Sequence, residues 1–135
     1  MLSPTTDTIR LFLHVLSASI WVGGQIVLAG LVPQIRRSYP EAIKLVARAY
    51  SRIAWPAFVI AVVTGIWNVI AVDASGWAEY QITLGVKLLL VAASGIAAAA
   101  HQFGHSKVAL AIGGAIGFLS ALGAMFVGFL LTTGT

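Results

Sequence analysis

The sequence contains no cysteine, which excludes disulfides, thiolate metal sites and iron–sulfur clusters. Charged residues are also scarce: they make up 9% of the 135 residues, whereas a typical soluble domain has about 25%. Only four residues are acidic, and all lie outside the long apolar runs, so a carboxylate proton relay through an apolar core is excluded. No nucleophile–base arrangement and no glycine-rich phosphate loop after a strand is present, which argues against hydrolase and nucleotide-binding chemistry.

What the chain has in abundance is apolar sequence. Hydrophobic residues make up 59% of it, and the mean hydropathy is +0.97. Four apolar runs each approach or exceed the roughly 20 residues that a helix needs to cross a bilayer: 9–32, 53–72, 82–100 and 108–131. The connections after the second and third runs are short. We therefore predict an all-α integral membrane protein, a single domain over 1–135, folded as an up-down-up-down four-helix bundle without a cleavable signal peptide.

The connection after the first run has a pattern of its own. Pro33 predicts the end of the first helix, and Ser38-x-x-Glu41 with Pro40 predicts a new helix start with a capping box. Basic residues then recur every four positions on one face: Lys44, Arg48 and Arg52. This pattern predicts a short amphipathic helix at the membrane surface that leads into the second span. Its basic face either anchors the topology or binds lipid headgroups or a partner.

The distribution of charge predicts the orientation. The formal net charge is +4, and most Lys and Arg residues cluster in the first connection. Such clustering is typical of membrane topology rather than of nucleic-acid binding. The positive-inside rule places the first and third connections in the cytoplasm. Both termini are therefore expected outside, in a multi-pass protein surrounded by the lipid bilayer.

Three polar residues interrupt the apolar runs at matching positions. Counted from the outer ends of their predicted spans, His14, Asn68 and Lys87 each lie roughly 6–8 Å below the edge of the apolar core at 1.5 Å per residue. Polar groups inside a membrane usually face the protein interior and serve function. These residues therefore predict a binding pocket in the outer leaflet, with Trp21, on the same helical stripe as His14, as one wall.

Each of these residues has a structural alternative. His14 is either a cofactor ligand or a neutral core histidine bonded to another helix. Lys87 either extends to the headgroups, or pairs with an anionic ligand group, or, if neutral, ligates a metal. Asn68 can form interhelical hydrogen bonds. Met125 lies near the same depth, where its thioether can complete a heme or copper site or fill space.

The end of the third run carries a second histidine pattern. His101 and His105 have i, i+4 spacing, which suits a metal on one helix face but is also common in a solvated pair. His101 lies about 21 Å along the helix from Lys87, so any site there is separate. The fourth run is rich in glycine, which favours tight packing in the bundle, a homodimer seam or room for a porphyrin.

In several motifs, and in their order and spacing along the chain, the sequence resembles the copper resistance protein D (CopD) family of bacterial membrane proteins. The resemblance rests on His-x6-Trp-Val-Gly-Gly from His14, on Pro33 followed by basic residues, on Thr64-Gly65-Ile66 with Asn68, and on Lys87-Leu-Leu-Leu-Val leading to His101. It implies the bacterial inner membrane and a role in copper movement. Copper favours soft ligands such as methionine with histidine, and the chain has only two methionines.

The sequence also resembles, more distantly, the bacterial heme-b protoporphyrinogen oxidase. The shared features are a first-helix His followed by Trp, here His14 and Trp21, and a third-helix Lys, here Lys87. That resemblance implies heme binding by His14 and Lys87, whereas Val-Gly-Gly-Gln after Trp21 departs from the oxidase. Three functions follow as hypotheses. The first is a heme-b protein for redox or electron transfer, the second is copper transport, and the third is an accessory subunit of a larger membrane redox complex or a homo-oligomer.

Overall fold

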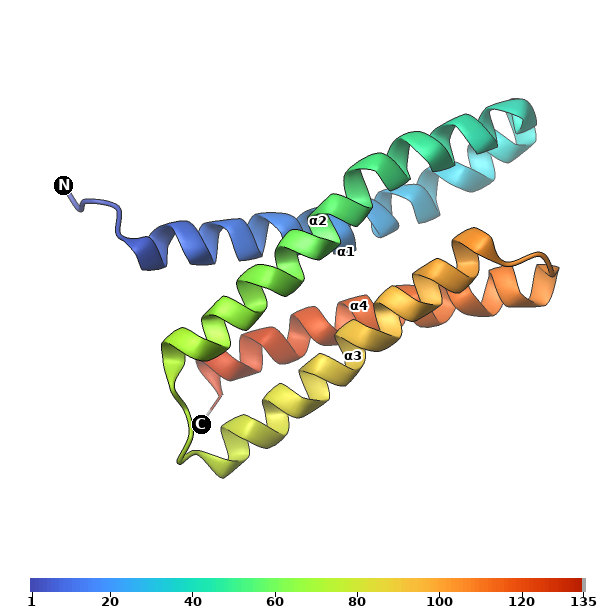
Figure 1. Ribbon diagram of the computed structural model, residues 1–135. Coiled ribbons are helices and arrows are strands. Elements are labelled where there is room, and N and C mark those ends of the chain that lie inside the picture. Colours follow the sequence, from blue (N-terminus) through green and yellow to red (C-terminus); the bar gives the residue numbers. More distant parts are fainter. Residues whose placement is uncertain (135) are drawn as a thin grey trace. The chain divides into compact units, whose positions relative to one another are not determined.

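The computed structural model describes residues 1–134, and all regular structure in this range is helical (Figure 1). The elements are α1 (Thr6–Ser38), a 3-10 turn η1 (Pro40–Ala42), α2 (Ile43–Val72), α3 (Ala78–Phe103) and α4 (Lys107–Thr133). Four segments are long and apolar enough to cross a membrane: α1, η1 together with α2, α3 and α4. The prediction of an all-α protein with four membrane-spanning helices is confirmed.

The helices pair in sequence order into two compact units. In the first hairpin, Met1–Asp73, α1 packs against α2, and in the second hairpin, from Ala74 onward, α3 packs against α4. Figure 1 shows that each hairpin is antiparallel, with α1 and α2 in blue to green and α3 and α4 in yellow to red. The single domain and the one four-helix bundle stay predictions.

Polar residues cap the first helix of one hairpin and the second helix of the other. At the start of α1, the Thr5 hydroxyl accepts from the Thr8 backbone N–H, and the Thr8 hydroxyl accepts from the Thr5 N–H. At the start of α4, the Ser106 hydroxyl accepts from the Ala109 N–H. These caps satisfy backbone donors that have no partner within the helix.

The prediction that Pro33 ends the first helix is wrong. Helix α1 runs through Pro33 to Ser38, and the Tyr39 N–H still bonds to the Ile35 carbonyl at 2.6 Å. An interior proline removes one backbone hydrogen bond and costs about 3 kcal/mol. The helix can continue because Pro33 removes only its own N–H, and the residues after it keep their backbone bonds.

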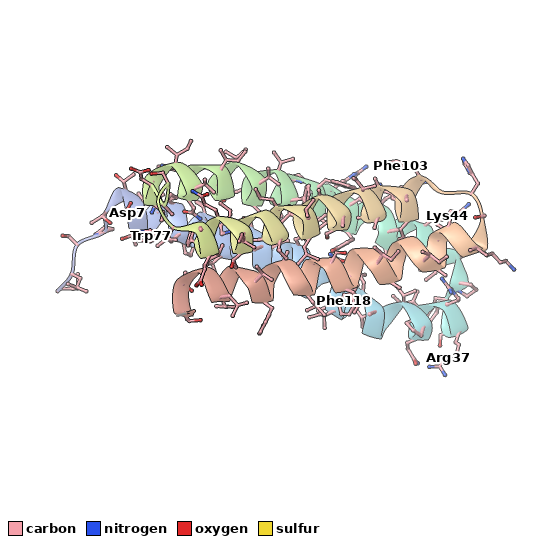
Figure 2. All side chains as sticks on the ribbon, turned by 90° about the horizontal axis from the view of Figure 1, so that it is seen from below. Asp7, Arg37, Lys44, Trp77, Phe103 and Phe118 are labelled. Carbon is pink, nitrogen blue, oxygen red and sulfur yellow. The ribbon has the colours of Figure 1, made fainter. Side chains whose placement is uncertain are left out.

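The predicted capping box at Ser38 is also wrong, whereas the predicted basic helix that leads into the second span is present as the start of α2. Ser38 is the last residue of α1, and η1 begins after Tyr39, which makes no side-chain capping bond. The basic residues Lys44, Arg48 and Arg52 follow η1 directly. They lie in the first turns of α2, in one continuous helix with the second span. Figure 2 shows Arg37 and Lys44 at the same end of the first hairpin and Asp7 at the opposite end.

The glycines of α4 pack against α3. Gly113 and Gly117 are buried. A Cβ on Gly113 would lie 3.0 Å from the Ala97 carbonyl oxygen and 3.0 Å from the His101 backbone nitrogen, so the two backbones nearly touch. Of the three interpretations of this glycine-rich run, tight packing within the protein is the one that these contacts support.

We expect Gly113→Ala to destabilise the second hairpin, whereas Gly85→Ala leaves it intact or slightly more stable. Both changes raise helix propensity by about 0.5–1 kcal/mol. Only the Gly113 change overpacks a backbone contact, at a cost of about 1–3 kcal/mol, because a Cβ on Gly85 meets nothing within 4 Å. Unfolding by SDS titration of the detergent-solubilised protein measures both. Equal stability of the two variants would contradict the packing described.

Candidate functional site

His14 of α1 is bonded to α2 through one ring nitrogen. Its Nδ1 lies 3.0 Å from the Ala61 carbonyl oxygen and 3.0 Å from the Thr64 hydroxyl. The carbonyl can only accept, and the Thr64 hydroxyl donates its own proton to the Ile60 carbonyl at 2.6 Å. Nδ1 therefore carries the hydrogen, and in the neutral ring the lone pair lies on Nε2.

Gly65 makes this approach of the ring possible. A Cβ at this position would lie 3.2 Å from His14 Cε1, so the ring would have to give way by a few tenths of an ångström, and 3.7 Å from Nδ1, an ordinary contact. In an α-helix the N–H of residue 65 bonds to the carbonyl of residue 61, so these two residues are stacked one turn apart. The bare glycine lets the ring reach the carbonyl beneath it.

Trp21 lies two turns further along α1 and packs with α2. Its ring is 5.4 Å from Trp55 and 4.5 Å from Phe58, centroid to centroid, and only 7% of the residue is exposed. Offset or tilted aromatic pairs at such separations stabilise beyond the apolar area they bury. The cluster fills the hairpin interface about 10 Å along the axis from His14. The predicted role of Trp21 as a pocket wall stays a prediction.

Asn68 lies one turn beyond the residues that contact His14. It follows Thr64 by four residues, about 6 Å along α2, and so lies level with Arg10 of α1, which precedes His14 by four residues. Arg10 is only 7% exposed, and its Nη1 lies 3.0 Å from an Asp7 carboxylate oxygen. Arg10 Nε and Asn68 Oδ1 are both buried without a hydrogen-bond partner.

Sequence reasoning missed Arg10. Its place four residues before His14 puts both residues on one helical stripe. That spacing was the available signal. It did not reveal that the side chain is buried, because burial depends on the packing of the helices.

In the second hairpin, Lys87 is directed toward α4. A Cβ on Gly128 would lie 3.1 Å from Lys87 Nζ and 3.4 Å from Cε. Leu90 contacts Gly123 in the same way, so Met125 lies between these two levels, within one helical turn of Lys87. The prediction that Lys87 and Met125 lie at one membrane depth stays a prediction. The convergence of His14 with Lys87 stays a prediction.

His101 repeats the arrangement of His14. Its Nδ1 forms a short hydrogen bond with the Leu110 carbonyl of α4. A Cβ on Gly114, four residues after Leu110, would lie 3.1 Å from that nitrogen. Nδ1 is again the donor, and Nε2 carries the lone pair of the neutral ring.

His105 does not share a helix face with His101. Helix α3 ends at Phe103, and Gly104 has extended backbone angles of φ −71° and ψ 151°, so the predicted i, i+4 helical pair is wrong. Among residues 1–134, no three His, Asp or Glu side chains gather where they could hold a metal ion.

A comparison with protein families finds a match to the copper resistance protein D family model over residues 44–112, just over half of the chain. The chain belongs to the CopD family. The matched range covers α2 from its second residue, all of α3 and the first turn of α4, with Asn68 and Lys87, and leaves out His14. The comparisons with curated proteins and with solved structures find no match. The similarity to the protoporphyrinogen oxidase is not among these findings.

We expect neutral His14 to be the Nδ1–H tautomer, which ¹⁵N spectra of the histidine-labelled protein can resolve. Gly65→Val pushes the ring off the Ala61 carbonyl, so the tautomer should shift and stability should fall by about 0.5–1.5 kcal/mol, the net value of one hydrogen bond. Gly23→Val is the control, because a Cβ there meets nothing within 4 Å. An Nε2–H tautomer in the unaltered protein would refute the assignment.

Proposed function

We propose that this CopD-family membrane protein binds heme b in its first hairpin and serves redox or electron-transfer chemistry, and that His14 would hold the iron through Nε2. The observation that carries the proposal is the bond from His14 Nδ1 to the Ala61 carbonyl. Histidines that bind metals usually donate their other ring N–H to a carbonyl or carboxylate, which fixes the tautomer and the ring orientation. His14 has this arrangement before any ligand binds.

The donor set of the first hairpin fits a porphyrin better than a bare ion. The hairpin contains a single histidine and, apart from Met1, no sulfur-bearing residue. A bare transition-metal ion takes several protein ligands, whereas heme iron already has four porphyrin nitrogens and needs one or two axial ligands. When bound, heme supplies one-electron chemistry. His14 would hold it, Gly65 leaves its side of the ring without a side chain, and Lys87 is a further candidate from the resemblance to the oxidase.

Copper transport is the second candidate, and the family match is the observation that favours it. Copper would then be cargo and not a resident cofactor. Imidazole and thioether groups both suit copper, so His14 and Met125 are the candidate ligands. Met1 and Met125 are the only methionines, so a continuous path of thioether groups is not available.

Addition of hemin to the purified protein tests the first candidate. We expect a Soret band shifted from that of free hemin, and we expect His14→Ala to lose at least tenfold in hemin affinity, since an axial bond to iron is lost. His105→Ala is the matched control, because His105 lies outside the helices and is exposed. Absence of any protein-bound Soret band would remove the heme proposal.

Metal analysis tests the copper candidate in the same preparations. Protein produced in copper-supplemented cells should carry copper, and His14→Ala and Met125→Ala should each lower the copper content at least severalfold. Copper content that is unchanged in both variants would exclude these ligands. A protein that carries copper but gains no Soret band with hemin would reverse the order of the two candidates.

A further inference from the structure

One turn from His14 toward the start of α1, the first hairpin has two polar residues at one level, Arg10 of α1 and Asn68 of α2. This polar level has no role in the proposed function. The pairing of His14 with Thr64 and of Trp21 with Phe58 sets the register of α1 against α2. In this register Arg10 faces the level of Asn68. Two of the three buried side-chain atoms that lack a hydrogen-bond partner in residues 1–134 belong to this level, Arg10 Nε and Asn68 Oδ1.

The Arg10 guanidinium is only partly satisfied. Asp7 contacts Nη1, but the Asp7 side chain is 71% exposed, so water weakens this ion pair. The Nε–H lies on the other edge of the guanidinium and has no hydrogen-bond partner, although the Arg10 side chain is only 9% exposed. Burying an N–H of a charged group without a partner costs free energy. The unpaired Nε–H of Arg10 therefore indicates that an acceptor is missing from this position.

We propose that Arg10 binds a carboxylate of the ligand that is held at His14. The Nε edge of a guanidinium accommodates a carboxylate through two parallel hydrogen bonds, which no other side chain does as well. The inference rests on the proposed function, because heme b carries its two carboxylates on short flexible arms at one edge of the ring. Arg10 is thus the residue that sets which edge of the ligand faces outward.

Asn68 completes this carboxylate site. Rotation of its terminal amide by 180° exchanges Oδ1 for Nδ2, two groups of nearly equal size. The amide then donates to the same carboxylate from α2 while Arg10 donates from α1. One anionic group would thereby satisfy both sides of the polar level.

A lipid phosphate is the other anion that could reach an arginine near the membrane surface. The burial of Arg10 inside the protein argues against it, since a headgroup phosphate approaches from the lipid side. A carboxylate presented by a ligand that is already bound to His14 would start one helical turn from Arg10 on the same stripe of α1. The proposal therefore commits to a carboxylate.

Three porphyrin probes test the carboxylate directly. The full-length protein in detergent is titrated with hemin, with hemin dimethyl ester, whose carboxylates are blocked, and with metal-free protoporphyrin IX, which keeps its carboxylates. We expect Arg10→Met to lower the affinity for hemin and for protoporphyrin IX at least tenfold and to leave the affinity for the ester unchanged. Arg10→Lys, which keeps the charge but loses the bidentate edge, should recover part of the loss. Asn68→Asp should lower the affinity for hemin and protoporphyrin IX, because it places a negative charge beside their carboxylates.

The control variant is Lys107→Met, which removes a cation from the start of α4 and should change no affinity. SDS unfolding of each variant shows whether it is folded. An equal loss of hemin and ester affinity in a folded Arg10→Met protein would overturn the proposal, because Arg10 would then be only structural. So would Arg10-dependent binding of a short-chain phosphatidic acid by a protein that binds no porphyrin.

The two proposals fail differently. If His14→Ala leaves hemin affinity unchanged while Arg10→Met lowers the affinity for protoporphyrin IX, the axial-ligand proposal is wrong and the carboxylate site stands. If His14→Ala removes hemin binding and Arg10→Met has no effect on any probe, the carboxylate site is wrong and the heme proposal stands. A wild-type protein that binds none of the three probes overturns both.

Discussion

The register of α1 against α2 in the first hairpin is set at its polar point by a hydrogen bond from the imidazole of His14 to the backbone carbonyl of Ala61. In a segment that spans a bilayer there is little water, so a buried polar side chain must find its partner within the protein. A helix offers few such partners, because its carbonyls already accept from its own N–H groups. The second lone pair of a carbonyl is what remains, and Gly65 gives the ring access to it.

The second hairpin solves the same problem in the same way. His101 reaches the Leu110 carbonyl beside Gly114, as His14 reaches the Ala61 carbonyl beside Gly65. In both cases the glycine follows the carbonyl residue by four positions, which is one helical turn and hence one side of the helix. The shared spacing is a consequence of backbone geometry. It gives each hairpin one histidine whose Nδ1 is bonded to the facing helix and whose Nε2 is the unprotonated nitrogen of the neutral ring.

Hydropathy was sufficient to predict the four helices, because the apolar runs reflect a bilayer of fixed thickness. It could not predict their ends. Proline and a capping motif are local signals, and at Pro33 and Ser38 the helix continues because the residues after the proline keep their own backbone hydrogen bonds. His105 was misplaced because the extended backbone of Gly104 ends α3 before the spacing can become a helical pair.

The candidate site was predictable only in part, because a sequence shows which side chains are polar but not how the helices pack. A histidine among apolar residues is visible in any sequence, so His14 could be selected from the sequence alone. The partners of His14 could not, since Ala61 contributes only its backbone, and Gly65 contributes the absence of a side chain. Arg10 lies near the start of its helix, where a basic residue is ordinary, and only the packing of the helices shows that it is buried.

The bond between His14 and α2 also has a consequence for biosynthesis. While α1 is the only helix made, its imidazole has no carbonyl of α2 to bond to, and the helix carries His14 into an apolar medium without this partner. Once α2 lies beside it, the ring is satisfied. Each hairpin, with one histidine on its first helix and the accepting carbonyl on its second, is therefore suited to enter the membrane as a pair of helices rather than one helix at a time.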